Sequence, residues 1–181
     1  MRSRKVKVLS TMAIFAAISV VLVALIHFPI LPAAPFLEYD PADIPILICG
    51  FAFGPVAGII VTVVASLIQG LTVSASSGIY GILMHVIATT ALVLASSLYY
   101  KKHKTKKGAL ISIILGVACM TLVMIPANLF VTPAFMGSPR SAIVELLPVI
   151  ILFNFIKAGV NGVITFFIYK KISNLIHKFD D

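Results

Sequence analysis

Three polar residues near the end of the chain share one helix face, because Asn154, Lys157 and Asn161 are spaced i, i+3, i+7. They lie in the stretch LFNFIKAGVNG, inside an otherwise apolar run. An ionisable residue deep in a membrane span is by default a candidate for a functional site. We expect no acidic partner for Lys157 at that depth, so its ammonium binds backbone carbonyls and water or a polar ligand. Asn side chains also bond between packed helices, and this alternative stays open, most of all for Asn161.

Three further polar residues are candidates for the same ligand-binding site. Asn128 follows Pro126, which frees a backbone carbonyl for another partner. Gln69 and His85 belong to two other apolar segments and lie toward their outer ends. A lone His is more often structural, and nothing near it in sequence completes a metal site. The apolar segments hold neither a carboxylate nor a nucleophile paired with a base, which argues against an enzyme.

The composition requires lipid as the solvent for most of the chain. Of 181 residues, 60% are hydrophobic and only 11% are charged, against about 25% in a soluble domain. The mean hydropathy is +1.12. The net charge of +8 comes from Lys and Arg that gather at the ends of apolar runs, as in cytoplasmic loops, so we expect no nucleic-acid partner. Cys49 and Cys119 both lie in apolar segments and indicate neither a disulfide framework nor a zinc site.

The elements that must position these side chains are six transmembrane helices in a single domain, an all-α integral membrane bundle. The first apolar run is too long for a signal peptide, and Gly54-Pro55 divides the awkward stretch 44–72 into two crossings. With both termini inside, every Lys and Arg except Arg140 and Lys157 is cytoplasmic. The expected helices cover residues 8–28, 41–53, 55–72, 78–100, 108–131 and 144–170.

The external loop 29–43 contains the unusual stretch PFLEYDPADIPIL, which holds three of the six acids of the chain, Glu38, Asp40 and Asp43. One interpretation is a solvated loop. The other is a lid over the pocket, whose acids stay in water or cap the second helix. Asp43 has the position of an N-cap before Pro45. The side chains expected to close over a ligand are Phe36, Leu37 and Tyr39.

Small residues mark one face of the first helix, where Ala13 and Ala17 form a small-xxx-small pair. Such pairs let another helix approach closely. The pair favours either packing within the bundle or docking of a partner protein, and the sequence leaves both open.

Several motifs together resemble one known family. FPILPAAPFLEYDPADIPIL followed by FGPVAGI is similar to the first external loop and second helix of the riboflavin-specific substrate-binding (S) subunits of energy-coupling factor (ECF) transporters. FNFIKAG and NLFVTPAF resemble two later elements of that family. The resemblance covers the whole chain. It implies a multi-pass protein of the bacterial cell membrane that captures riboflavin from outside and holds no cofactor.

Carried over residue by residue, the resemblance makes Asn128, Asn154 and Lys157 ligand-binding residues. Ala13 and Ala17 match the face that docks on the transmembrane coupling subunit, and two cytoplasmic ATPases drive uptake. Some relatives carry Lys at the position of Ser66 and Asn at that of His85, which leaves room for a flavin analogue. The alternative function is an S subunit for another vitamin, such as thiamine or biotin.

Overall fold

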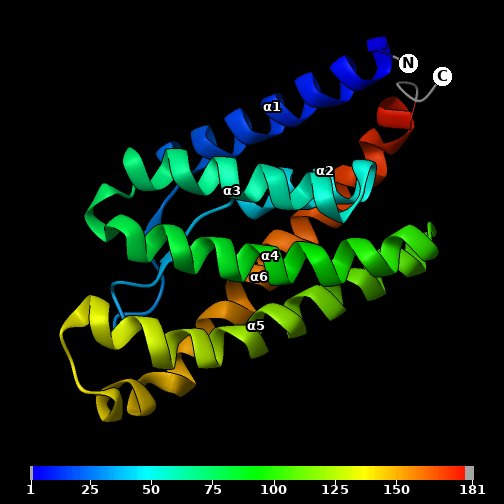
Figure 1. Cartoon of the computed structure of the whole chain (residues 1–181). Coiled ribbons are helices and arrows are strands. Elements are labelled where there is room, and N and C mark those ends of the chain that lie inside the picture. The colour runs from blue at the N-terminus through cyan, green and yellow to red at the C-terminus, as the bar shows by residue number, and fades with distance from the viewer. Residues whose placement is uncertain (1, 178–181) are drawn as a thin grey trace.

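The computed structural model describes residues 2–177, which form six α-helices arranged as one bundle (Figure 1). The predicted all-helical fold is confirmed. The start of the first helix and the end of the last helix lie at the same end of the bundle as the turn between the fourth and fifth helices. The helices are α1 (Arg2–Leu25), α2 (Asp43–Phe53), α3 (Pro55–Leu71), α4 (Gly78–Lys102), α5 (Lys106–Met136) and α6 (Arg140–His177), with a short 3₁₀ turn η1 (Ala75–Ser77) before α4.

Within the described residues, four helices are long and apolar enough to cross a membrane, namely α1, α4, α5 and α6. The other two are shorter, because α2 has 11 residues and α3 has 17. At a rise of about 1.5 Å per residue, α2 alone covers roughly half of a hydrocarbon core. The glycine predicted to separate these two helices does so. Gly54 has a φ of 94°, a conformation that residues with a Cβ rarely adopt, and Pro55 begins α3.

Some helix ends differ from those expected from sequence. α2 begins at Asp43 rather than near residue 41, and α5 extends to Met136 rather than to 131. α5 continues through Pro126 and Pro133, because each proline removes only one hydrogen bond from a helix that packs against α4 and α6. It ends at Gly137, whose φ of 61° provides a left-handed cap.

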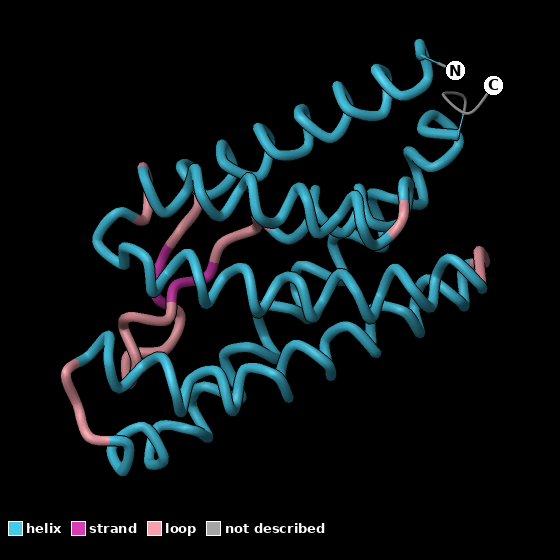
Figure 2. The backbone as a smooth tube through the Cα atoms, viewed as in Figure 1, coloured by secondary structure: helices cyan, strands magenta, loops and turns pink. Residues whose placement is uncertain are grey.

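The segment between α1 and α2 enters the bundle instead of staying outside it. In Figure 2 it passes from the end of α1 toward the ends of α5 and α6 and then returns to the start of α2. Two short antiparallel strands, β1 (Phe28–Pro29) and β2 (Glu38–Tyr39), join its two arms. The residues that follow, from Tyr39 to the start of α2, are buried. This segment therefore forms part of the wall of the cavity described below.

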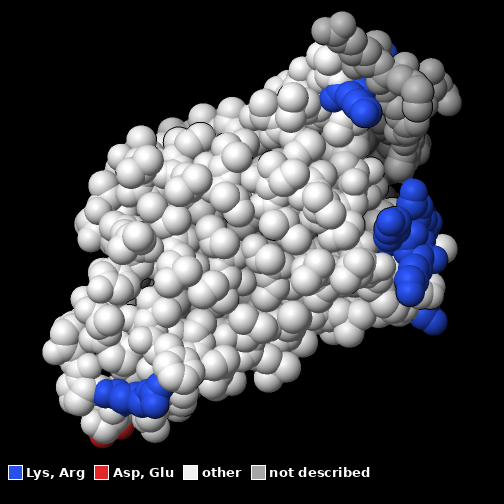
Figure 3. All heavy atoms as spheres, viewed as in Figure 1, with Lys and Arg blue, Asp and Glu red and all other residues white. Residues whose placement is uncertain are grey.

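The basic side chains are unevenly distributed along the bundle. Figure 3 shows most of the visible Lys and Arg at the end that carries the termini and the α4–α5 turn, while the flank between the ends carries almost no charge. Many hydrophobic side chains of the helices are exposed, among them Leu67, Leu94 and Phe167. Such a surface is suited to lipid. One of the basic residues expected at this end, Lys178, lies outside the described residues.

Candidate functional site

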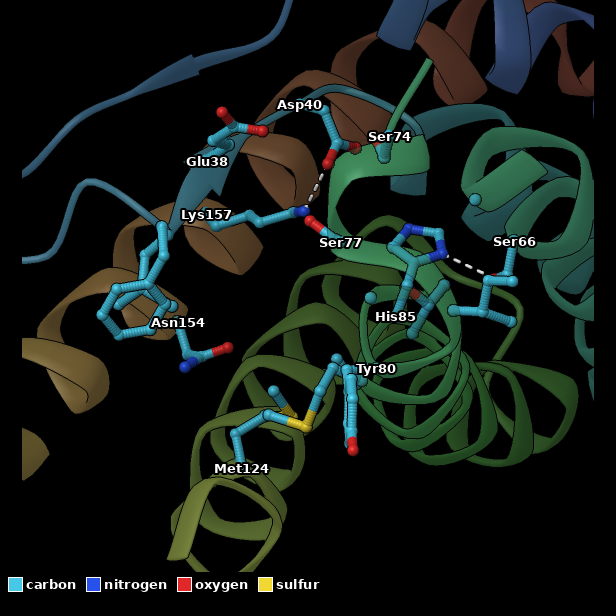
Figure 4. A pocket seen from close by; sticks show the side chains of 18 of the residues that line it. Glu38, Asp40, Ser66, Ser74, Ser77, Tyr80, His85, Met124, Asn154 and Lys157 are labelled. Carbon is cyan, nitrogen blue, oxygen red and sulfur yellow. Dashed lines mark hydrogen bonds and ion pairs between the residues drawn. The ribbon is translucent and has the colours of Figure 1, made fainter. Parts of the chain in front are cut away.

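A cavity of about 990 Å³, including its open mouth, lies in the half of the bundle away from the termini. The loop between α1 and α2, the η1 turn and helices α3 to α6 all contribute to its wall. Met84, Met120, Met124 and Phe153 supply apolar surface, while the polar side chains cluster on two sides of the cavity (Figure 4).

The first polar side comes from α5 and α6 and contains all three residues predicted to bind ligand. Asn128, Asn154 and Lys157 line the cavity together, and each is at most 7% exposed. The two asparagines donate Nδ2 to the carbonyl four residues earlier, Met124 and Ile150, both at 2.8 Å.

These bonds fix the orientation of both amides. The Asn128 Oδ1 accepts from the Thr132 hydroxyl at 2.9 Å. The Asn154 Oδ1 has no hydrogen-bond donor among the described residues, so it is available to accept from a ligand.

Lys157 has an acidic partner, which corrects the expectation from sequence. Its Nζ lies 2.6 Å from Oδ2 of Asp40, in the loop between α1 and α2 (Figure 4). Burial raises the pKa of the Asp40 carboxyl, but Lys157, His85 and the Ala42 N–H together outweigh burial and hold that pKa below its ordinary value. The prediction of an unpaired lysine was wrong because it treated the acids of this loop as lying outside the bundle. Lys157 has three N–H groups, and the structure records a partner for one.

The loop acids occupy three different environments. Glu38 is exposed, but Asp40 is 9% exposed and Asp43 is fully buried. The expectation that all three stay in water or cap α2 is therefore wrong for two of them. Asp43 is the first residue of α2 and not its cap, since Ala42 holds that position without a side-chain hydrogen bond. The Asp43 carboxylate instead accepts from Thr89 at 2.7 Å and from Asn161 at 3.0 Å.

Asn161 lies outside the cavity, although the sequence made it a candidate lining residue. It is fully buried one turn beyond Lys157 and binds the loop. Tyr39 is also absent from the wall, because its hydroxyl donates to the Asn161 Oδ1 at 2.9 Å. The other two predicted lid residues, Phe36 and Leu37, do line the cavity and are half-buried.

The second polar side of the cavity comes from α3 and α4. Gln69, His85 and Ser66 all line it, as expected for the first two. The Ser66 hydroxyl lies 2.7 Å from the Thr62 carbonyl and 2.6 Å from His85 Nδ1, so it forms hydrogen bonds with both. The Nε2 atoms of Gln69 and His85 have no hydrogen-bond partner among the described residues.

The site shows no arrangement typical of catalysis. Within the described part of the chain, no group of three His, Cys, Asp or Glu side chains is placed to hold a metal ion. The charged side chains of the cavity wall, Glu38, Asp40 and Lys157, instead join a polar and apolar lining that suits a non-covalent ligand.

The pair on the first helix faces away from the bundle. Ala13 and Ala17 are exposed, whereas Phe15, Ala16 and Ser19 of the same helix are buried. Packing within the bundle therefore does not explain the small-residue face.

Comparison with known proteins places the chain among membrane transport components. The family model described as "ECF transporter, substrate-specific component" matches residues 7–169. The curated protein "Riboflavin transporter FmnP" of Bacillus subtilis (strain 168) is 31% identical, with 96% of each chain covered. "Riboflavin transporter RibU" of Staphylococcus aureus (strain TCH60) is also 31% identical, over 95% of this chain and 93% of the relative.

A solved structure of an S component has the same fold over almost its full length. It is the subject of "Structure and mechanism of the S component of a bacterial ECF transporter". The TM-score is 0.84 at 31% identity, and the match covers 95% of this chain and 98% of that one.

Proposed function

This chain belongs to the family of substrate-specific components of ECF transporters, and we propose that it captures riboflavin for uptake across the bacterial cell membrane. Members of this family are transporter components and not enzymes. Two of the relatives described above are named riboflavin transporters. The observation in the structure that carries the proposal is the cavity wall formed by Asn128, Asn154 and Lys157.

The chemistry of that wall suits a flavin. The flavin ring has carbonyl oxygens and ring nitrogens along one edge and apolar faces. The free N–H groups of Lys157 donate to carbonyl oxygens, and the Asn154 Oδ1 accepts from a ring N–H. Met120, Met124 and Phe153 offer apolar surface to the faces of the ring.

The orientation in the membrane follows from the distribution of charge. The end that carries the termini holds most of the visible Lys and Arg (Figure 3), and such residues collect on the cytoplasmic side. We therefore place both termini inside and the cavity in the outer half, where it meets extracellular ligand. Six crossings, with the pair α2 and α3 counted as two, agree with this placement. Labelling single cysteines introduced at exposed Lys104 and Arg140 from outside intact cells tests it, and only the second should react.

The energy for uptake comes from partner proteins. We propose that a transmembrane coupling subunit docks on α1 at Ala13 and Ala17, and that two cytoplasmic ATPases complete the transporter. This chain then acts as the receptor of the complex.

The direct test is binding of riboflavin to the purified protein. We expect the sample to retain a yellow flavin spectrum or to quench the fluorescence of added riboflavin. Lys157→Ala and Asn154→Leu should each weaken binding at least tenfold, which is about 1.4 kcal/mol. A folded protein that ignores riboflavin but binds thiamine or biotin would assign the cavity to that vitamin instead.

A further inference from the structure

Asn161 contacts no cavity surface, yet it connects three groups of the loop that carries Asp40. Its Oδ1 accepts from the Tyr39 hydroxyl at 2.9 Å, and its Nδ2 donates to the Asp40 carbonyl and to the Asp43 Oδ2, both at 3.0 Å. One fully buried amide thus uses both of its N–H groups and its oxygen on a segment about 120 residues away in the chain.

The segment held by Asn161 in turn holds Lys157. The Asp40 carboxylate accepts from the Ala42 amide through Oδ1 at 3.0 Å and from Lys157 Nζ through Oδ2 at 2.6 Å. Lys157 and Asn161 are four residues apart and lie on the same face of α6. The loop therefore crosses this face with its backbone fixed at one turn and its carboxylate bound to the ammonium at the next.

A lysine needs such a partner to present its ammonium in one position. Its side chain has four rotatable bonds and loses considerable freedom when it is fixed. Binding is stronger when that loss occurs on folding and not on ligand binding. Only the Asp40 carboxylate is recorded as a partner of the Lys157 ammonium among the described residues, so the position of Asp40 decides where the ammonium lies.

We propose that Asn161 is a positioning residue for ligand capture, which acts through Asp40 to hold the Lys157 ammonium at the cavity wall. This inference rests on the proposed function of the cavity as a riboflavin site. Asn161 binds the loop, Asp40 orients the ammonium, and the remaining N–H groups of Lys157 meet the ligand. The Lys157 side chain thereby takes part both in attaching the loop and in recognising the ligand.

The test is a thermodynamic cycle, because a structural residue and a positioning residue differ in their dependence on Lys157. Asn161→Leu keeps the branched shape and the number of side-chain heavy atoms, although its methyl groups are larger, and it removes every side-chain hydrogen bond. In the otherwise unchanged protein it should weaken riboflavin binding at least tenfold. In a background that carries Asp40→Asn and Lys157→Met, where no ammonium is left to position, the same change should alter the affinity less than twofold. Equal losses in both backgrounds, or no loss in a folded variant, would overturn the proposal.

The control lies one turn further along the same helix. Thr165 is fully buried and donates only to the Asn161 carbonyl, so Thr165→Val removes a polar group of α6 that does not contact the loop. It should leave riboflavin affinity unchanged. A tenfold loss in that variant would show that α6 responds to any polar deletion and would overturn the role of Asn161.

A milder variant decides the question if Asn161→Leu does not fold. Tyr39→Phe removes a single hydrogen bond to Asn161. We expect dissociation of riboflavin to accelerate at least threefold, and this acceleration to vanish in the Asp40→Asn, Lys157→Met background. Acceleration that persists there would contradict the proposal. Failure of the proposed function looks different, since the unchanged protein would then bind no riboflavin at all.

Discussion

The ammonium of Lys157 and the carboxylate of Asp40 form a buried ion pair at 2.6 Å, across 117 residues of sequence. The side chains are only 8% and 13% exposed. Each charge is costly to remove from water, and each stabilises the other where solvent does not screen them. This ion pair thus attaches the loop between α1 and α2 to α6, and removal of either charge leaves the other buried without a partner.

Breaking that pair from one side should destabilise the fold. Asp40→Asn leaves the Lys157 charge buried without a counter-charge, and such changes cost about 3–5 kcal/mol. Asp40→Asn combined with Lys157→Met should recover most of the loss. Thermal unfolding in detergent measures both. The control is Glu38→Gln in the same loop, since Glu38 is exposed and should shift stability by no more than about 0.5 kcal/mol. A double variant as unstable as Asp40→Asn alone would contradict this account.

The pair also predicts the response of stability to acid. The pKa of Asp40 in the folded protein lies below its ordinary value of 3.8. The unfolded chain therefore binds the proton more readily, so the contribution is complete above about pH 4 and is lost as the pH falls through the folded pKa. Unfolding midpoints measured from pH 3 to 7 should fall more steeply below pH 4 in the unchanged protein than in the Asp40→Asn, Lys157→Met variant. Parallel curves would exclude Asp40 as the titrating group.

Periodicity explains how much of this site the sequence predicts. Asn154 and Lys157 lie in a long helix, where spacing fixes the face, and they do line the cavity with Asn128. The path of the loop follows no period, so its contacts with α6 could not be derived in the same way. The sequence did hold one signal for these contacts, namely opposite charges that each lacked a partner. A lysine lay in an apolar run, and three acids lay in one rigid stretch of loop.

The path of the loop also explains why Tyr39 and Asn161 were wrongly predicted to line the cavity. Tyr39 and Asn161 have types that suit a ligand site, and both are buried. They bond to one another at 2.9 Å and not to the cavity. Their partners lie more than 100 residues away, and only the folded loop brings them together. The types of these residues therefore suggested that their side chains form hydrogen bonds, but not which neighbours they bind.

The charge of the cavity predicts discrimination against phosphorylated flavins. Its charged lining residues are Glu38, Asp40 and Lys157, and Asp40 already neutralises the lysine. A phosphate ester would meet Glu38 with no unpaired ammonium among these residues to balance it. Flavin mononucleotide should therefore bind at least tenfold more weakly than riboflavin in competition titrations. Glu38→Gln should reduce this difference between the two affinities. Equal affinities of the unchanged protein for the two flavins would show that the phosphate stays outside the cavity.

The exposed pair on α1 predicts a separation of binding from transport. Ala13 and Ala17 point away from the bundle, and neither lines the cavity. Leucine at both positions fills the surface that a partner helix needs for close approach. Ala13→Leu with Ala17→Leu should therefore leave riboflavin affinity unchanged in the purified protein but abolish ATP-driven uptake in cells that carry the partner subunits.

Bulk added to a lipid-facing surface could slow transport for reasons unrelated to docking, and a matched variant separates the two effects. Val160 and Val163 of α6 are 41% and 54% exposed, so Val160→Leu with Val163→Leu enlarges another part of the flank. Uptake should persist in this variant because these positions lie on a different helix from the proposed docking face. Normal uptake in the α1 variant would reject the docking role of Ala13 and Ala17, while loss of uptake in both variants would show that α1 has no special part in coupling.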